Sequence, residues 1–313
     1  MSCHACLGKY APEAQPLLAA KKEEAAGRSP ARIFKDYVHN AALMAIPAAL
    51  VLVVTACVCL GLGYDLPTIT GGVEPGLEFP EPLVVNPPGN ARAEAAVVFL
   101  HGLGGHARGV DGVGIAANLI QLPGVKWIFP DAPVMPVTVE GGRNIPSWYD
   151  IERFTDSIED FVDDKTRIIQ SAQFVTGIVQ ELVAKDGIAP EKIVLGGFSQ
   201  GGAVALTAAL HGASALGPGV SLGGVFALSS YLPMRDMYPS PMMPDPSVAA
   251  RTKVLIAHGD EDAILPLEFG QVTAQKLSAM GANVEFHEMY GVGHERLGDE
   301  ETAILRRWLA QLV

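Results

Sequence analysis

Short apolar runs alternate with longer segments of helical periodicity over most of the chain. Apolar residues recur at helical spacing in Lys165–Lys185, Leu267–Met280 and Thr302–Leu312. Other runs have the length and composition of buried strands: AAVVFLHG (95–102), VKWIFP (125–130), KIVLGGF (192–198), GGVFALS (223–229), KVLIAHG (253–259) and NVEFHEM (283–289). This alternation predicts an α/β fold, with a mostly parallel sheet covered by helices on both faces.

The amino-terminal part has a different pattern. No residue from Tyr37 to Tyr64 carries a full charge, and Ala41–Gly63 is one continuous apolar run. At about 1.5 Å rise per residue, a helix over this run is long enough to cross a bilayer. We therefore predict a transmembrane helix at 41–63, between a polar tail at 1–40 and a Pro/Gly-rich linker at 64–82. A cleaved signal peptide and a buried core helix are the alternatives that we consider weaker.

The distribution of basic residues predicts an orientation for this segment. No Lys or Arg follows the span before Arg92, whereas five closely precede it: Lys21, Lys22, Arg28, Arg32 and Lys35. The positive-inside rule then places the amino terminus in the cytosol and the main domain, residues 83–313, in a lumen or outside the cell. A main domain that faces the cytoplasm, or a cytoplasmic protein, is the alternative.

Composition and charge limit the functions open to the chain. The net charge of -12 argues against a nucleic-acid partner, because binding to phosphates needs a basic surface. The four cysteines lie in the first 59 residues, so the main domain has no thiol chemistry. Unmodified thiols are the simplest interpretation, a zinc site lacks a second ligand pair, and S-acylation is the alternative for Cys3, Cys6, Cys57 and Cys59.

A candidate nucleophile follows the KIVLGGF run. Gly197-Phe198-Ser199-Gln200-Gly201 is a G-x-S-x-G sequence between a predicted strand and a small-residue helix at Gly202–Leu210. The flanking glycines permit a sharp turn that presents Ser199 at the start of the helix, where free N–H groups favour an anion. An ordinary strand-to-helix turn is the simpler interpretation, but the strand-turn-helix context favours a nucleophile.

A serine nucleophile needs a histidine base and a carboxylate that orients it. His294 follows the last predicted strand, whereas His287 lies within that strand and His258 just before a turn, which suggests structural roles for both. Either Asp260 or Asp262 can supply the carboxylate, and the spacing alone does not separate them. The order Ser, Asp, His is the one that α/β-hydrolases use.

The oxyanion that forms on carbonyl attack needs two preorganised donors. One is the N–H of the residue after the nucleophile, here Gln200. The other is expected from the Gly-rich turn at 101–105, and we choose the N–H of Leu103. A phosphate-binding role for this turn is excluded, because it lacks the Lys-Ser/Thr ending of a P-loop.

These motifs together resemble the acyl-protein thioesterase, lysophospholipase and carboxylesterase family of α/β-hydrolases. The resemblance runs from Leu83 to the end of the chain and rests on L-H-G-L-G (100–104), F-P-D-A-P-V-M-P-V-T (129–138), S-W-Y-D (147–150), G-F-S-Q-G-G (197–202), H-G-D-E-D (258–262) and G-V-G-H (291–294). It implies Ser199 as nucleophile, Asp262 rather than Asp260 as the triad acid, and His294 as base.

The resemblance also implies a substrate class. Family members cleave acyl groups from protein thioesters, lysophospholipids or small esters, with no metal or organic cofactor. Trp148, Leu232 and Leu265 are candidates for lining an acyl groove, although lone apolar residues are more often core. The segment 139–145 is more polar than the apolar loop of eukaryotic thioesterases, which weakens the case for long acyl chains. An inactive, membrane-tethered binding module is the non-enzyme alternative.

Overall fold

The computed structural model describes residues 77–87, 89, 91–109, 122–217, 219–239, 247–294 and 298–313. The predicted transmembrane segment at 41–63 lies outside these residues, as do the polar tail at 1–40 and most of the linker at 64–82. Within the described residues, no helix has both the length and the apolar character needed to cross a membrane.

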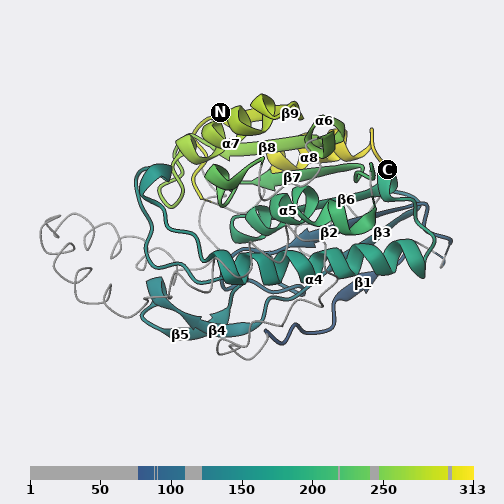
Figure 1. Cartoon of the computed structure of the whole chain (residues 1–313), viewed down its shortest axis with the longest axis horizontal. Helices are drawn as coiled ribbons and strands as arrows, with labels where there is room; N and C mark the ends of the chain where they lie inside the picture. The colour runs from purple at the N-terminus through teal and green to yellow at the C-terminus, as the bar shows by residue number, and fades with distance from the viewer. Residues whose placement is uncertain are drawn as a thin grey trace, which may run out of the picture. The chain divides into compact units, whose positions relative to one another are not determined.

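A seven-stranded sheet forms the centre of the domain, in the order β1-β3-β2-β6-β7-β8-β9 (Figure 1). Its strands are β1 (Leu83–Val85), β2 (Ala95–Leu100), β3 (Val125–Phe129), β6 (Ile193–Phe198), β7 (Gly224–Leu228), β8 (Lys253–Gly259) and β9 (Asn283–Met289). Only the edge strand β1 is antiparallel to its neighbour in this sheet. The predicted mostly parallel sheet is confirmed.

Successive strand residues face two separate hydrophobic cores. In β2, Val98 and Leu100 pack toward one core, whereas Val97 and Phe99 pack toward the other. Both faces are therefore dry, which explains why the strands are continuous apolar runs rather than alternating ones. The first core receives α4 (Lys165–Ala184), α5 (Gln200–Leu210), α6 (Ser247–Arg251) and α7 (Leu267–Ala279), and the second receives α8 (Asp299–Leu309).

Two helix starts differ from the sequence prediction. Helix α5 begins at Gln200 rather than at Gly202, directly after Ser199. Helix α8 begins at Asp299 rather than Thr302, because Glu301 accepts a hydrogen bond from the N–H of Gly298 and closes the first turn. The apolar residues on which the prediction of a helix at Thr302–Leu312 depends lie on the buried face of α8, and its first turn is polar.

A short antiparallel hairpin was not predicted. Strands β4 (Val134–Val137) and β5 (Arg143–Pro146) pair with each other, and the 3-10 turn η4 (Thr138–Glu140) joins them. Pro136 lies inside β4, and proline argues against a strand in a sequence-based interpretation. The residue is tolerated here because the hairpin has only two strands, so each is an edge. The polar segment 139–145 therefore forms the turn and the second strand of this hairpin.

The packed domain extends ahead of Leu83. The ring of Phe79 stacks on Phe174 of α4 at a centroid distance of 4.1 Å and lies near Trp148. Phe79, within the segment expected to be linker, thus packs against the hydrophobic core of the domain.

Candidate active site

Ser199 occupies a strained turn between β6 and α5. Its φ of 52° lies in the region that residues with a side chain rarely adopt. The neighbouring glycines make the turn possible: a Cβ on Gly201 would collide with the carbonyl oxygen of Leu100, and one on Gly197 would meet the same atom at 2.6 Å. Helix α5 can therefore approach β2 closely, and this places the half-buried Ser199 at the carboxyl end of the sheet.

Three of the predicted site residues form a continuous chain of hydrogen bonds. His294 Nε2 lies 2.9 Å from the Ser199 hydroxyl, and His294 Nδ1 lies 2.7 Å from Oδ2 of Asp262. Because a carboxylate only accepts, Nδ1 carries the proton and Nε2 is free to accept the one from Ser199. Ser199 lies 95 positions and Asp262 lies 32 positions before His294 in the sequence. The three residues come from the loops after β6, β8 and β9.

The environment of Asp262 keeps it ionised. Burial by itself raises the pKa of this carboxyl group. The hydrogen bonds with His258 and His294, and the one from the N–H of Leu265, lower that pKa. The net result is a pKa well below the ordinary range of an aspartate. The Asp262 side chain has no exposed surface, whereas the His294 side chain is 14% exposed. A permanently charged acid behind a partly accessible histidine is the arrangement that a general base requires.

The structure separates the two candidate acids. Asp260 is exposed and its Oδ1 accepts a hydrogen bond from Gly291 N, so it fixes the loop that carries His294. Asp262 contacts His294 itself. The expectations for the other histidines also agree with the structure, since His287 pairs with Glu285 on β9 and His258 is buried at the end of β8.

The two predicted oxyanion donors lie on segments that adjoin Ser199. A Cβ on Gly102 would lie 3.4 Å from the Cβ of Ser199, so the turn that carries Leu103 runs beside the nucleophile. The turn is tied to the end of β5 by the bond from Gly104 N to Pro146 O. Gln200 is the first residue of α5, and an N–H in the first turn of a helix has no partner within the helix. Both roles stay predictions.

The side chain of Gln200 has a function that the sequence did not suggest. It is buried, and its amide oxygen accepts from Trp148 N while its nitrogen donates to the carbonyl oxygen of Tyr149. Ser147 Oγ joins the same network at 3.0 Å from the Gln200 nitrogen. The residue after the nucleophile thus holds the segment 147–149 against the start of α5.

The three predicted substrate contacts are core residues in this structure. Trp148, Leu232 and Leu265 are 0%, 1% and 3% exposed. Trp148 donates its indole N–H to the carbonyl oxygen of His101, and Leu265 donates its backbone N–H to Asp262. They support the site from within, and their contact with a substrate stays a prediction. Within the described residues, no cluster of His, Cys, Asp and Glu is arranged to hold a metal ion.

Comparison with known proteins agrees with this geometry. Residues 81–310 match the model of a family described as Phospholipase/Carboxylesterase. The chain belongs to this family. Acyl-protein thioesterase 1 of Gibberella zeae is 34% identical over 228 residues, which cover 71% of this chain and 94% of that protein. Acyl-protein thioesterase 1 of Neurospora crassa is 36% identical over 226 residues, with 71% and 88% covered.

A solved structure of a related protein has the same fold. The crystal structure of Zea mays acyl-protein thioesterase 2 superimposes with a TM-score of 0.61 at 30% identity and covers 74% of this chain and 98% of that one. Membership of the phospholipase/carboxylesterase family makes the chain an enzyme, a serine hydrolase acting on thioester or carboxylic ester bonds. The family resemblance seen in the sequence is confirmed.

Proposed function

We propose that the chain hydrolyses the thioester of S-acylated proteins, with Ser199, His294 and Asp262 as its catalytic residues. The observation that supports this most directly is the unbroken chain of hydrogen bonds from Ser199 through His294 to Asp262. The choice of a protein thioester is supported by relatives named acyl-protein thioesterase that match over most of their length. The strained backbone of Ser199 adds a second, independent mark of a nucleophile.

In the proposed reaction His294 takes the proton of Ser199, and the resulting alkoxide attacks the acyl carbonyl. The oxyanion is held by the N–H groups of Gln200 and Leu103, and His294 returns the proton to the leaving sulfur as the carbon–sulfur bond breaks. Water, deprotonated by the same histidine, then attacks the acyl-enzyme and releases the carboxylic acid. Asp262 remains ionised throughout and stabilises the imidazolium.

A lysophospholipid, whose acyl chain is long, remains a further alternative, and a small carboxylic ester is the second candidate substrate. It is supported by the burial of Trp148, Leu232 and Leu265, which leaves these residues almost no surface for an acyl chain. The hairpin segment near the site is also polar at its exposed positions Arg143 and Asn144. Both observations favour a compact acyl group over a long one.

The deciding experiment compares kcat/KM of the full-length protein on a palmitoyl thioester and an acetyl ester. Ser199→Ala serves as the blank and Ser278→Ala, at an exposed position in the last turn of α7, as the matched control. We expect the thioester to be preferred by more than about tenfold, roughly 1.4 kcal/mol of transition-state discrimination. A preference for the acetyl ester would assign the small-ester function instead. Absence of fluorophosphonate labelling on the folded wild type would contradict both and leave the inactive binding module.

We further propose, from the sequence alone, that residues 41–63 anchor the enzyme in a membrane with its amino terminus in the cytosol. The apolar run and the basic residues before it support this proposal. Resistance of the protein to alkaline extraction from membranes tests the anchor. Protease protection in sealed microsomes tests the orientation: we expect the hydrolase domain to be protected, and digestion of the domain would favour the cytoplasmic-facing alternative.

A further inference from the structure

A cavity of about 400 Å³ lies at the opposite end of the sheet from Ser199. Charged residues in its lining comprise three bases, Arg92, Lys126 and Lys185, and one acid, Asp186. Arg92 precedes β2, Lys126 is the second residue of β3, and Lys185 follows the last turn of α4. These are the points where strands begin, whereas the triad lies where strands end. The cavity is therefore a separate place on the molecule from the hydrolytic site.

One of these bases is held by an ion pair, and the position of a second is marked by a nearby turn. The Lys126 ammonium lies 2.7 Å from Asp186 Oδ2, and its side chain is only 17% exposed. The Arg92 guanidinium lies over the turn after α4, because a Cβ on Gly187 would be 3.8 Å from its Nη2. Lys185 pairs with Glu181 at 3.1 Å, but both side chains are more than half exposed, and such a pair stabilises little.

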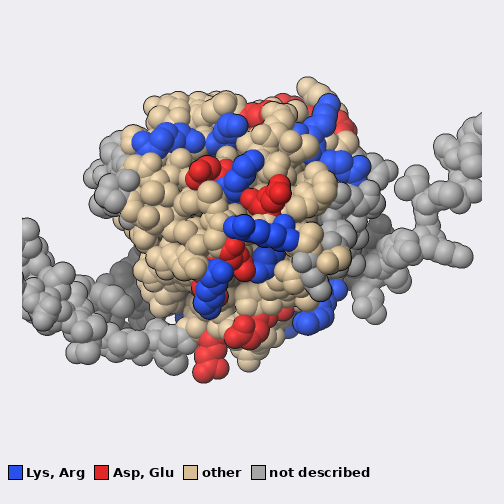
Figure 2. Space-filling view, turned by 90° about the vertical axis from the view of Figure 1, so that its right-hand side faces the viewer, with Lys and Arg blue, Asp and Glu red and all other residues tan. Residues whose placement is uncertain are grey.

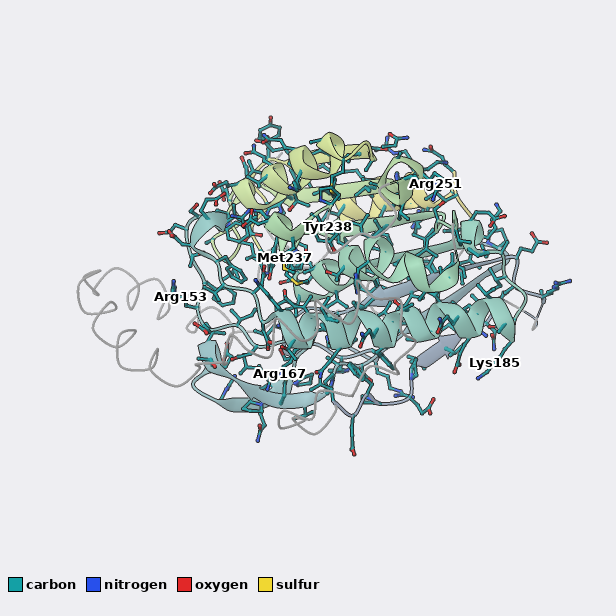
Figure 3. All side chains as sticks on the ribbon, viewed as in Figure 1. Arg153, Arg167, Lys185, Met237, Tyr238 and Arg251 are labelled. Atoms are coloured by element: carbon teal, nitrogen blue, oxygen red, sulfur yellow. The ribbon has the colours of Figure 1, made fainter. Side chains whose placement is uncertain are left out.

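The edge of the sheet around the cavity is basic, although the chain as a whole is acidic. Figure 2 shows this end of the molecule, where Lys and Arg side chains are spread among Asp and Glu. Lys185 and Arg251 lie at this end, and Arg153 lies at the other (Figure 3). Strand starts and helix ends place nine bases here: Arg92, Lys126, Lys185, Lys192, Arg251, Lys253, Lys276, Arg306 and Arg307. Among the described residues, the acids at this end of the sheet are Glu94, Glu181, Asp186 and Glu191.

Helix dipoles account for only part of this charge. Bases in the last turn of a helix, or directly after it, complement the partial negative charge there, which suffices for Lys185, Arg251 and Lys276. Arg92 and Lys126 belong to no helix. Among the described residues, Arg92 also has no carboxylate paired with it. Lys126 pairs with Asp186, but Arg92 has no such partner in the described part of the chain, and this second cation indicates that the cavity is suited to an anion.

We propose that this cavity binds a phosphate group, held between Arg92 and Lys126 with Lys185 at its edge. The planar guanidinium offers two parallel N–H donors that match phosphate oxygens, and the lysines add point charges. After Asp186 is counted, the lining carries an excess of two positive charges, which a phosphate monoester dianion would balance. The phosphate can belong to a soluble metabolite or to a lipid headgroup.

The test is titration of the full-length protein with inorganic phosphate and with inositol trisphosphate, followed by calorimetry and by thermal unfolding. The variant is the double substitution Arg92→Ala and Lys185→Ala, which removes two exposed bases. Lys126 is kept, because its removal would leave Asp186 without its ion pair. Lys253→Ala, an exposed base on the same edge outside the cavity, and Arg153→Ala, at the opposite end, are the matched controls.

We expect phosphate to raise the Tm of the wild type relative to chloride at equal ionic strength, because a ligand of the native state stabilises it. The double variant should bind at least about tenfold more weakly, while both controls bind like the wild type. Equal binding by the double variant, or equal weakening in Lys253→Ala, would overturn the site in favour of general attraction by the basic edge.

A second arm identifies the source of the phosphate. Wild type and double variant are mixed with phosphatidylcholine vesicles, with and without a phosphoinositide, and separated by flotation. If adding the phosphoinositide increases vesicle binding by the wild type but not by the double variant, the ligand is the lipid headgroup. An equal gain in both proteins, together with a tenfold loss of inositol trisphosphate binding in the variant, assigns a soluble ligand.

Discussion

The imidazole of His258 lies 3.4 Å from Oδ2 of Asp262, the same oxygen that His294 contacts at 2.7 Å. His258 is fully buried, and its Nε2 is 2.8 Å from the carbonyl oxygen of Leu265. A carbonyl only accepts, so Nε2 carries the proton. It is directed at the carbonyl oxygen of Leu265 and at Oδ2 of Asp262. The Nδ1 atom has no hydrogen-bond partner among the described residues and packs against Gly270 of α7. His258 thus supports Asp262, the proposed triad acid, from behind.

Replacing His258 should reduce catalysis without weakening substrate binding. In His258→Leu, Asp262 loses one of the donors that keep its pKa low and the carboxylate is held less firmly. We expect kcat to fall about tenfold, or about 1.4 kcal/mol in the barrier, with KM within twofold of the wild type. Steady-state kinetics on whichever ester or thioester the enzyme prefers provides the measurement.

The conservative variant separates positioning from packing. His258→Gln keeps a donor at the end of the side chain and should recover part of kcat. Equal kcat for His258→Leu and the wild type would mean that His258 is not needed to orient the acid.

The side chain of Gln200 can be tested apart from its backbone. Gln200→Ala keeps the N–H that we propose as an oxyanion donor but leaves the buried Trp148 N without its partner, and Tyr149 O keeps only the Ser147 hydroxyl as donor. Leaving buried polar groups unpaired costs about 1–3 kcal/mol each. We expect the free energy of unfolding to fall by about 2–3 kcal/mol in urea titrations, and kcat to fall as the segment 147–149 shifts. Gln173→Ala, exposed on α4, should change neither quantity.

Much of the proposed catalytic edge could be predicted because its signals are local in sequence. Ser199 follows the continuous apolar run of β6, and His294 follows β9, in which apolar and polar residues alternate. A parallel sheet brings the ends of such strands to one edge. The choice between Asp260 and Asp262 could not be made from spacing, because both follow β8 within three residues. The family resemblance implied Asp262, and the structure pairs Asp260 with Gly291 and Asp262 with His294.

Other features depend on contacts between distant segments and give no local signal. The side-chain amide of Gln200 forms hydrogen bonds with residues that lie more than 50 positions away in the sequence. Strand β1 has three residues and exists because Leu83 to Val85 pair with the edge of β3. The residue type of an apolar position does not show whether it lines a groove or lies in the core. This is why the burial of Trp148, Leu232 and Leu265 could not be predicted from the sequence.

Glu301 predicts an unusual dependence of stability on pH. This side chain is 2% exposed, and burial, opposed by the bond from Gly298 N and assisted by the nearby charges of Asp262 and Glu300, raises its pKa to about 7. Its folded pKa exceeds the unfolded value, so the folded state favours the neutral acid. Stability is therefore unaffected below the unfolded pKa, falls as pH rises between the two values, and is lowest above pH 7.

Glu301→Gln should remove this penalty. The neutral amide can still accept from Gly298 N, so we expect the variant to be more stable than the wild type at pH 8, by the order of 3 kcal/mol, and equally stable near pH 4. Urea unfolding at the two pH values provides the measurement. Glu191→Gln, at an exposed position whose charge is not among those that raise the pKa of Glu301, is the matched control. A gain of the same size at pH 4 would show that charge is not the cause.

Two glycines in helices should respond in opposite ways to the same substitution. A Cβ on Gly201 would collide with the carbonyl oxygen of Leu100, and main chain cannot move aside without parting α5 from β2. Gly201→Ala should therefore destabilise the protein by about 3 kcal/mol or more. Gly177, inside α4, has no atom within 4 Å of the added carbon, so Gly177→Ala should stabilise by about 0.5–1 kcal/mol.

Activity distinguishes this pair as well. In Gly201→Ala the turn that carries Leu103 and the start of α5 are pushed apart, and the two proposed oxyanion donors no longer converge. We expect a loss of at least about a hundredfold in kcat, measured at a temperature where the variant is still folded, whereas Gly177→Ala retains wild-type kcat. Wild-type turnover in a folded Gly201→Ala variant would show that the close approach of α5 to β2 is not needed to form the oxyanion site.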